Sequence, residues 1–197
     1  MSSSVATSQL YLWNVPNLLS LSRLPLAIVL FACIAHSWWA VGLAVFVVAM
    51  FTDWLDGWWA RRFNQLTLVG RNLDPLTDKV LIGGAFIFLI PVETAGVAPW
   101  MVTVVVCREL LITGLRGIVE AAGAKFGADW FGKLKTVLQS AVITGVFLLQ
   151  TLRELPDAAE LVRFLTPVQT LLLYAMLVAT VGSGLQYAVK AVRLFSR

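Results

Sequence analysis

Four aspartates are the residues of this sequence most capable of chemistry, and they lie in or beside segments apolar enough for a lipid bilayer. They form two pairs, Asp53 with Asp56 and Asp74 with Asp78. Because the members of each pair are three or four residues apart, each pair lies on one face of a helix. Four uncompensated carboxylates within a bilayer would cost on the order of 10 kcal/mol, so cations must lie among them.

The type of ligand atom predicts which cations bind there. Carboxylate oxygens without a neighbouring His or Cys are the ligands that Mg²⁺ or Mn²⁺ prefers, and they do not suit zinc. Two such ions would neutralise the charge of four aspartates. We therefore predict a two-ion site with Asp53, Asp56, Asp74 and Asp78 as ligands. The structural alternative is that these acids only form buried ion pairs with basic residues nearby in sequence, namely Arg61, Arg62, Arg71 and Lys79.

Two glycines accompany the aspartates. Gly57 follows Asp56 directly, and Gly70 precedes the second pair. Backbone without a side chain lets a ligand or a neighbouring helix approach closely. The polar stretch between the pairs, residues 61–71, predicts a turn that joins two antiparallel helices. Both acid pairs would then face one cleft.

Written in order, these residues are Asp53-x₂-Asp56-Gly57-x₂-Ala60-Arg61-x₈-Gly70-x₃-Asp74-x₃-Asp78. They resemble the signature of the CDP-alcohol phosphatidyltransferase family at every fixed position. The resemblance implies a membrane enzyme in which an acceptor hydroxyl attacks a phosphorus of a CDP-linked lipid or alcohol, and CMP leaves.

The resemblance also implies roles for individual residues. Asp53, Asp56 and Asp74 would be metal ligands, and Asp78 would be a ligand that also accepts the proton of the acceptor as general base. The cytidine and diphosphate of CDP-diacylglycerol would rest on a surface formed by Gly57, Ala60, Arg61 and Gly70.

A second group of charges predicts an anion site. Arg108 and Arg116 are eight residues apart and nearly share a helix face, and Lys133 and Lys135 begin the next helix. Arginine and lysine bind phosphate through charge and several N–H donors. The structural alternative is that Arg116 pairs with Glu120 and that the lysines anchor the helix at the headgroups.

Shorter resemblances indicate the acceptor. Three segments, residues 17–23, 108–112 and 132–136, resemble family members that use glycerol 3-phosphate. The nearest alternative is a member that makes cardiolipin, with phosphatidylglycerol as acceptor; serine and inositol-phosphate acceptors rank below. Outside the family, a divalent-cation transporter and a structural membrane scaffold remain as alternatives, although the acids lie toward one membrane face only.

The composition indicates what must position these residues. With 59% hydrophobic and 13% charged residues and a mean hydropathy of +0.83, the chain is not a water-soluble globule. We predict a single all-α integral membrane domain over residues 1–197, with the fold of that family. Residues 1–13 would form a short interfacial segment. Six transmembrane helices would cover residues 18–35, 39–60, 72–90, 100–119, 131–150 and 165–189.

Six spans place both termini on one side of the membrane. Of the 15 Lys and Arg residues, all but Arg153 and Arg163 fall on that side, so the positive-inside rule assigns the termini and the acids to the cytoplasmic face of an inner membrane. The scattered basic residues do not form a nucleic-acid surface. Small-residue stripes, such as Ala175-x₃-Ala179-x₃-Ser183, allow close helix packing in the bundle or in a homodimer.

Arg23 lies inside the first predicted span and has two interpretations. Its side chain extends to the cytoplasmic headgroups, or it helps Asn17 to hold a lipid phosphate of CDP-diacylglycerol at that depth.

Overall fold

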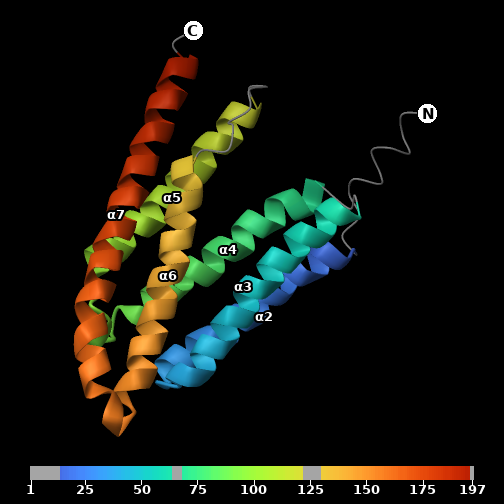
Figure 1. Ribbon diagram of the computed structural model, residues 1–197. Helices are drawn as coiled ribbons and strands as arrows, with labels where there is room; N and C mark the ends of the chain where they lie inside the picture. The colour runs from blue at the N-terminus through green and yellow to red at the C-terminus, as the bar shows by residue number, and fades with distance from the viewer. Residues whose placement is uncertain (1–13, 64–67, 122–129, 196–197) are drawn as a thin grey trace. The chain divides into compact units, whose positions relative to one another are not determined.

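The computed structural model describes residues 14–63, 68–121 and 130–195, and within these ranges all regular secondary structure is helical. The predicted interfacial segment 1–13 lies outside them. The α-helices are α2 (Val15–Ala35), α3 (Trp39–Arg62), α4 (Leu68–Leu89), α5 (Pro99–Ala121), α6 (Trp130–Arg153) and α7 (Ala159–Phe195), with short 3₁₀ turns η1 (Glu93–Ala95) and η2 (Pro156–Ala158) (Figure 1). The described helices form two compact units, one with α2 to α4 and one with α5 to α7.

In the first unit, α2 and α3 form an antiparallel pair that packs along its length (Figure 1). The Asn14 side chain caps α2 by accepting a hydrogen bond from the Asn17 N–H at 2.9 Å. The turn into α3 requires a left-handed residue, and Ser37 provides it with φ of 57°. The core of this pair includes Leu30, Phe46 and Ala49.

Helix α4 packs on α2 through a close aromatic contact. The ring of Phe31 stacks on Phe88 with a centroid distance of 4.8 Å. A Cβ atom on Gly84 would lie 2.1 Å from the Phe31 ring, so the glycine makes room for this stack. The contact fixes α4 against α2 at the end far from the acidic residues of α4.

In the second unit, α6 and α7 form another antiparallel pair, and α5 packs on α7. Gln169 of α7 donates a hydrogen bond to the backbone carbonyl of Val142 at 2.9 Å, and Gly145 leaves the space that the Gln169 side chain needs. Ala179 and Ser183 of the predicted small-residue stripe are buried, whereas Ala175 is exposed. The stripe therefore serves packing within this unit.

The length and apolar composition of the helices are typical of a membrane protein. Four of them are long and apolar enough to cross a bilayer: α2, α3, most of α6, and the segment Pro156–Lys190 that contains most of α7. The described parts of α4 and α5 do not meet that measure, and both helices contain charged residues within their length, among them Asp74 and Asp78 in α4 and Arg108 and Glu109 in α5. Six helices were predicted and six are present among the described residues; that all six cross the membrane stays a prediction.

Candidate functional site

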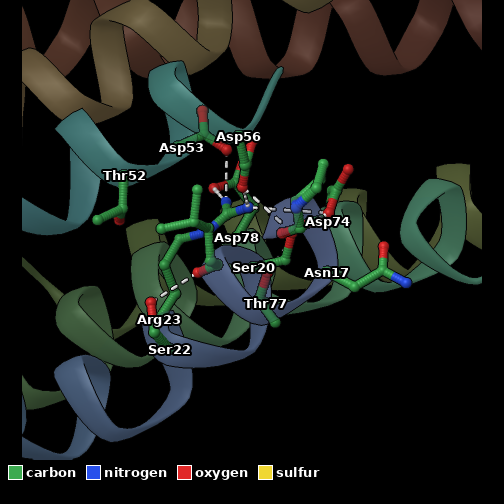
Figure 2. A network of polar contacts seen from close by, with 12 residues as sticks. Asn17, Ser20, Ser22, Arg23, Thr52, Asp53, Asp56, Asp74, Thr77 and Asp78 are labelled. Atoms are coloured by element: carbon green, nitrogen blue, oxygen red, sulfur yellow. Dashed lines mark hydrogen bonds and ion pairs between the residues drawn. The ribbon is translucent and has the colours of Figure 1, made fainter. Parts of the chain in front are cut away.

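The four predicted carboxylates of α3 and α4 meet around one side chain, Arg23 of α2 (Figure 2). Arg23 Nη1 lies 2.5 Å from Asp53 Oδ1 and 3.1 Å from Asp78 Oδ1. Arg23 Nη2 lies 2.6 Å from Asp56 Oδ2 and 3.9 Å from Asp74 Oδ1. The prediction that both acid pairs face one place is therefore confirmed, and we call these four residues and Arg23 the acid cluster.

The register of the α2–α3 pair explains how Arg23 reaches the acids of α3. Arg23 and Asp53 lie at equal sequence distances on either side of Trp38 in the turn, and so do Ser20 and Asp56. In an antiparallel helix pair, residues equally distant from the turn lie side by side. Ser20 and Arg23, one helical turn apart, therefore face Asp56 and Asp53.

Ser20 joins the acid cluster through its hydroxyl group. Ser20 Oγ donates to Asp74 Oδ1, and it also lies 3.1 Å from Asp56 Oδ2 and 3.0 Å from the Pro16 carbonyl. It thus links an acid of α3 to an acid of α4. Ser20 was not predicted as a site residue; its position one turn before Arg23 is the signal that could have identified it.

Burial differs sharply among these side chains. The Arg23 side chain is 0% exposed and that of Asp56 is 4% exposed, whereas those of Asp53, Asp74 and Asp78 are 37%, 45% and 33% exposed. The acid cluster is therefore closed on the side of Asp56 and Arg23 and accessible on the other. The interpretation that Arg23 extends to the headgroups is wrong, because its side chain ends inside the cluster.

The other predicted donor-binding residues lie on the same helices. The guanidinium of Arg61 lies over Gly57, with Nη1 3.5 Å from where a Cβ of Gly57 would be. Ala60, Gly70 and Asn17 are buried. The predicted turn over residues 61–71 was too long: Arg61 still belongs to α3, and Gly70 already belongs to α4.

The donor set of the acid cluster fits a hard divalent cation. Four carboxylates and one hydroxyl converge where a positive charge is already bound, and such oxygen donors suit Mg²⁺ or Mn²⁺. In residues 14–63, 68–121 and 130–195, no three acidic, His or Cys side chains form a ready ligand set. The guanidinium of Arg23 lies between the carboxylates, so it must move for them to share an ion.

The second unit contains a cationic cluster, which we define as Arg108, Arg116, Lys135, Glu109 and Tyr187. Glu109 accepts hydrogen bonds from Lys135 and, at 3.0 Å, from Arg108. The guanidinium carbons of Arg108 and Arg116 each lie 5.9 Å from the centroid of the Tyr187 ring, and Arg116 donates to the Tyr187 hydroxyl at 3.2 Å. Glu109 and Tyr187 were not predicted as site residues.

The structure brings together three of the four predicted acceptor-binding cations. Lys133 is exposed and makes no ion pair within the described residues. The alternative partner of Arg116, Glu120, has a side chain outside the described part of the structure. The buried Nε of Arg108 has no hydrogen-bond partner among the described residues, so this guanidinium retains an unused donor.

Comparisons with known proteins agree with the motif. The sequence model of the CDP-alcohol phosphatidyltransferase family matches residues 13–192. A Bacillus subtilis protein named CDP-diacylglycerol–glycerol-3-phosphate 3-phosphatidyltransferase is 34% identical over 191 residues, covering 89% of this chain and 94% of that protein. A Mycobacterium tuberculosis protein named probable phosphatidylglycerophosphate synthase is 36% identical over 187 residues, with coverages of 91% and 82%. An Escherichia coli protein with the same name as the Bacillus one is 36% identical over 141 residues, with coverages of 66% and 75%.

Proposed function

Because the chain belongs to the CDP-alcohol phosphatidyltransferase family, we propose that it transfers the phosphatidyl group of CDP-diacylglycerol to glycerol 3-phosphate. The products are phosphatidylglycerol phosphate and CMP. The observation that carries the proposal is the convergence of Asp53, Asp56, Asp74 and Asp78 on one point. The donor and acceptor are those in the names of the Bacillus and Escherichia relatives.

The reaction forms one bond to phosphorus and breaks another. The acceptor hydroxyl oxygen attacks the phosphorus nearer the diacylglycerol, and the bond from that phosphorus to the oxygen shared with CMP breaks. Asp78 takes the hydroxyl proton. Its side chain is 33% exposed and can pass the proton to water, whereas Asp56 is almost fully buried.

Asp53, Asp56, Asp74 and Asp78 would hold two Mg²⁺ or Mn²⁺ ions. When bound, these ions would polarise the diphosphate and stabilise the negative charge on the departing CMP. Gly57, Ala60, Arg61 and Gly70 form the surface for the cytidine and diphosphate. The Arg61 guanidinium over Gly57 supports this role, since it provides positive charge where α3 has no side chain. Asn17 and Arg23 hold the lipid phosphate.

The phosphate of the acceptor binds to Arg108, Arg116, Lys133 and Lys135. Support comes from the Tyr187 ring, which holds both arginines, and from the unused Nε donor of Arg108. The contact of Glu109 with Arg108 and Lys135 shows that an anionic oxygen already binds between these two cations. A phosphate oxygen carries the same charge and accepts the same hydrogen bonds.

In the membrane, we propose that all six helices cross, with both termini and the acid cluster on the cytoplasmic face of the inner membrane, and that the enzyme is a homodimer. The distribution of Lys and Arg supports this orientation. An active site at the cytoplasmic interface would admit a lipid from the bilayer and a water-soluble acceptor from the cytoplasm.

An acceptor panel tests the proposed function. Purified protein receives labelled CDP-diacylglycerol and Mg²⁺ with glycerol 3-phosphate, phosphatidylglycerol, serine or inositol phosphate in separate reactions. We expect labelled phosphatidylglycerol phosphate and stoichiometric CMP with glycerol 3-phosphate. Product formed only with phosphatidylglycerol would identify a cardiolipin synthase, and absence of CMP with every acceptor would contradict the proposed reaction.

A further inference from the structure

Arg23 contacts the oxygens that the proposed function assigns to metal ions. We infer that Arg23 is a displaceable internal counter-ion, which competes with divalent cations for these oxygens and is released toward the substrate phosphates when the ions bind. The inference rests on the proposed function for the identity of the metal ligands. It adds an exchange of partners, in which the ions take the place of Arg23 among the aspartates.

Geometry sets the two occupants in competition. The Arg23 nitrogens lie 2.5 to 3.1 Å from one oxygen each of Asp53, Asp56 and Asp78, so the guanidinium lies between the oxygens that a shared ion would use. Mg²⁺ requires ligand oxygens at about 2.0–2.1 Å. An ion bonded to these three oxygens together would overlap the Nη atoms of Arg23.

The charges determine which occupant prevails. One guanidinium carries a single positive charge, and four carboxylates surround it. Two divalent cations balance those carboxylates fully. Once they are bound, the attraction that held Arg23 is neutralised and the ions repel its positive charge.

Arg23 is also incompletely satisfied where it lies. Its Nε is buried and has no hydrogen-bond partner in the described ranges. A buried donor without a partner destabilises this arrangement. Phosphate oxygens offer a planar guanidinium bidentate hydrogen bonds, so a donor diphosphate beside the ions gives the released Arg23 a better partner.

Side-chain footprinting on the wild-type protein tests the release directly. The purified protein in detergent is treated with an arginine-selective dicarbonyl reagent, with chelator or with saturating Mn²⁺, and modification is measured by peptide mass spectrometry. Arg153 and Arg163, both exposed, are the internal references. We expect Mn²⁺ to raise modification of Arg23 by about tenfold, as for a side chain freed from a mostly occupied site. Added CDP should then protect Arg23 again.

Electron paramagnetic resonance detects unbound Mn²⁺ and therefore measures whether the metal binds. This measurement distinguishes the reasons for which Arg23 could stay unreactive. If Mn²⁺ binds and Arg23 stays unreactive, this inference is overturned and the proposed transfer reaction is untouched. If Mn²⁺ does not bind, both the inference and the proposed metal ligands are wrong. If the acceptor panel fails while Arg23 becomes reactive, only the choice of reaction is wrong.

Two substitutions give an independent measurement. Competition predicts that Arg23→Met binds Mn²⁺ about tenfold more tightly than the wild type, because the internal competitor is gone. Arg23→Met should also unfold at a lower temperature in chelator, and this difference should shrink at saturating Mn²⁺. Arg23→Lys keeps the charge but cannot bridge four carboxylates, so we expect an intermediate affinity. Weaker Mn²⁺ binding by Arg23→Met would show that Arg23 is a fixed organiser of the site.

Discussion

Gly57 and Gly84 lie in the same helical unit but in different surroundings. A Cβ atom on Gly57 would be at ordinary contact distance, 3.5 Å from Arg61, whereas one on Gly84 would lie 2.1 Å from the Phe31 ring. Packing alone therefore requires a glycine at position 84 and not at position 57. If activity requires a glycine at position 57, the physical reason is the close approach of a ligand to the backbone there.

We predict that Gly57→Ala keeps the thermal stability of the wild type and raises KM for CDP-diacylglycerol by about tenfold, a loss of about 1.4 kcal/mol of binding. The matched variant Gly84→Ala should lose about 1–3 kcal/mol of stability through overpacking, with little effect on KM in the protein that remains folded. Unfolding curves and initial rates measure both. Unchanged kinetics in Gly57→Ala would remove Gly57 from the donor site.

The proposed general base gives a second prediction. Asp78→Asn keeps an oxygen at this position but cannot accept a proton, so kcat should fall by about 10²–10⁴. Asp157→Asn, at an exposed aspartate of η2, is the control and should behave as the wild type. Initial rates are measured at saturating substrates and Mg²⁺. A kcat within a few-fold of wild type in Asp78→Asn would contradict the role of Asp78.

At the scale of residues, the sequence predicted the acids better than their partner. The three- and four-residue spacings place each pair of aspartates on one helix face, and the predicted turn between the pairs was needed to bring the two faces together. The partner was sought among Arg61, Arg62, Arg71 and Lys79, which are near in sequence. Arg23 was missed in this role because its proximity depends on the register between α2 and α3, which is a tertiary property.

At the scale of elements, α5, α6 and α7 jointly form the cationic cluster, and α5 and α7 make its aromatic contacts. The buried ring of Tyr187 on α7 lies within cation–π distance of two arginines on α5, and its hydroxyl accepts a hydrogen bond from Arg116. Tyr187 therefore positions both guanidinium groups. No sequence pattern predicted this contact, since no spacing relates Tyr187 to arginines on another helix.

We predict a graded effect of substitutions at Tyr187 on KM for glycerol 3-phosphate. Tyr187→Phe, which removes only the hydroxyl, should raise KM by about threefold, and Tyr187→Leu, which removes the ring, by about tenfold. The control is Tyr174→Leu, at an exposed position of the same helix. KM for CDP-diacylglycerol should remain unchanged in all three. A larger change in KM for the lipid than for glycerol 3-phosphate would refute this assignment.

Helix positions were predicted well from apolar periodicity and length, and helix ends less well. The last helix begins at Ala159, several residues before the predicted start at 165. The predicted span left out Glu160 and Arg163, because charged residues do not fit an apolar span. Similarly, α3 and α4 extend into the polar stretch that was predicted to be a turn. Hydropathy predicts only the part of a helix that is buried in lipid. A helix continues beyond the lipid as long as its backbone hydrogen bonds continue, so hydropathy places the ends of helices poorly.

At the scale of the whole molecule, the apolar surface is consistent with a lipid environment. Leu171, Val178 and Leu185 of α7, spaced by seven residues, are 72%, 74% and 64% exposed. Lipid tails are as apolar as these side chains, so such a surface needs no protein partner. The predicted homodimer and the predicted single domain stay predictions. Lipid-facing and partner-facing surfaces have similar composition, so exposed apolar residues do not identify a dimer contact.

Topology reporters test the predicted crossing of α4. In a bacterial host, we expect green fluorescent protein fused after residue 197 to fluoresce, and alkaline phosphatase fused after Gly96 to be active outside the cytoplasm. The reason is that the Lys and Arg residues hold the termini inside, and three crossings then place η1 outside. A cytoplasmic signal from the fusion after Gly96 would show that α4 does not cross.

The left-handed turn at Ser37 determines the phase between α2 and α3, and thereby which side chains face each other far along the pair. Inserting a single residue there would rotate the acidic face of α3 by about 100° and shift it by about 1.5 Å along its axis. Every ionisable residue would be retained, yet Asp53 and Asp56 would face away from Ser20 and Arg23. A mutation roughly 20 Å from the nearest carboxylate could thus abolish activity as completely as the loss of an aspartate.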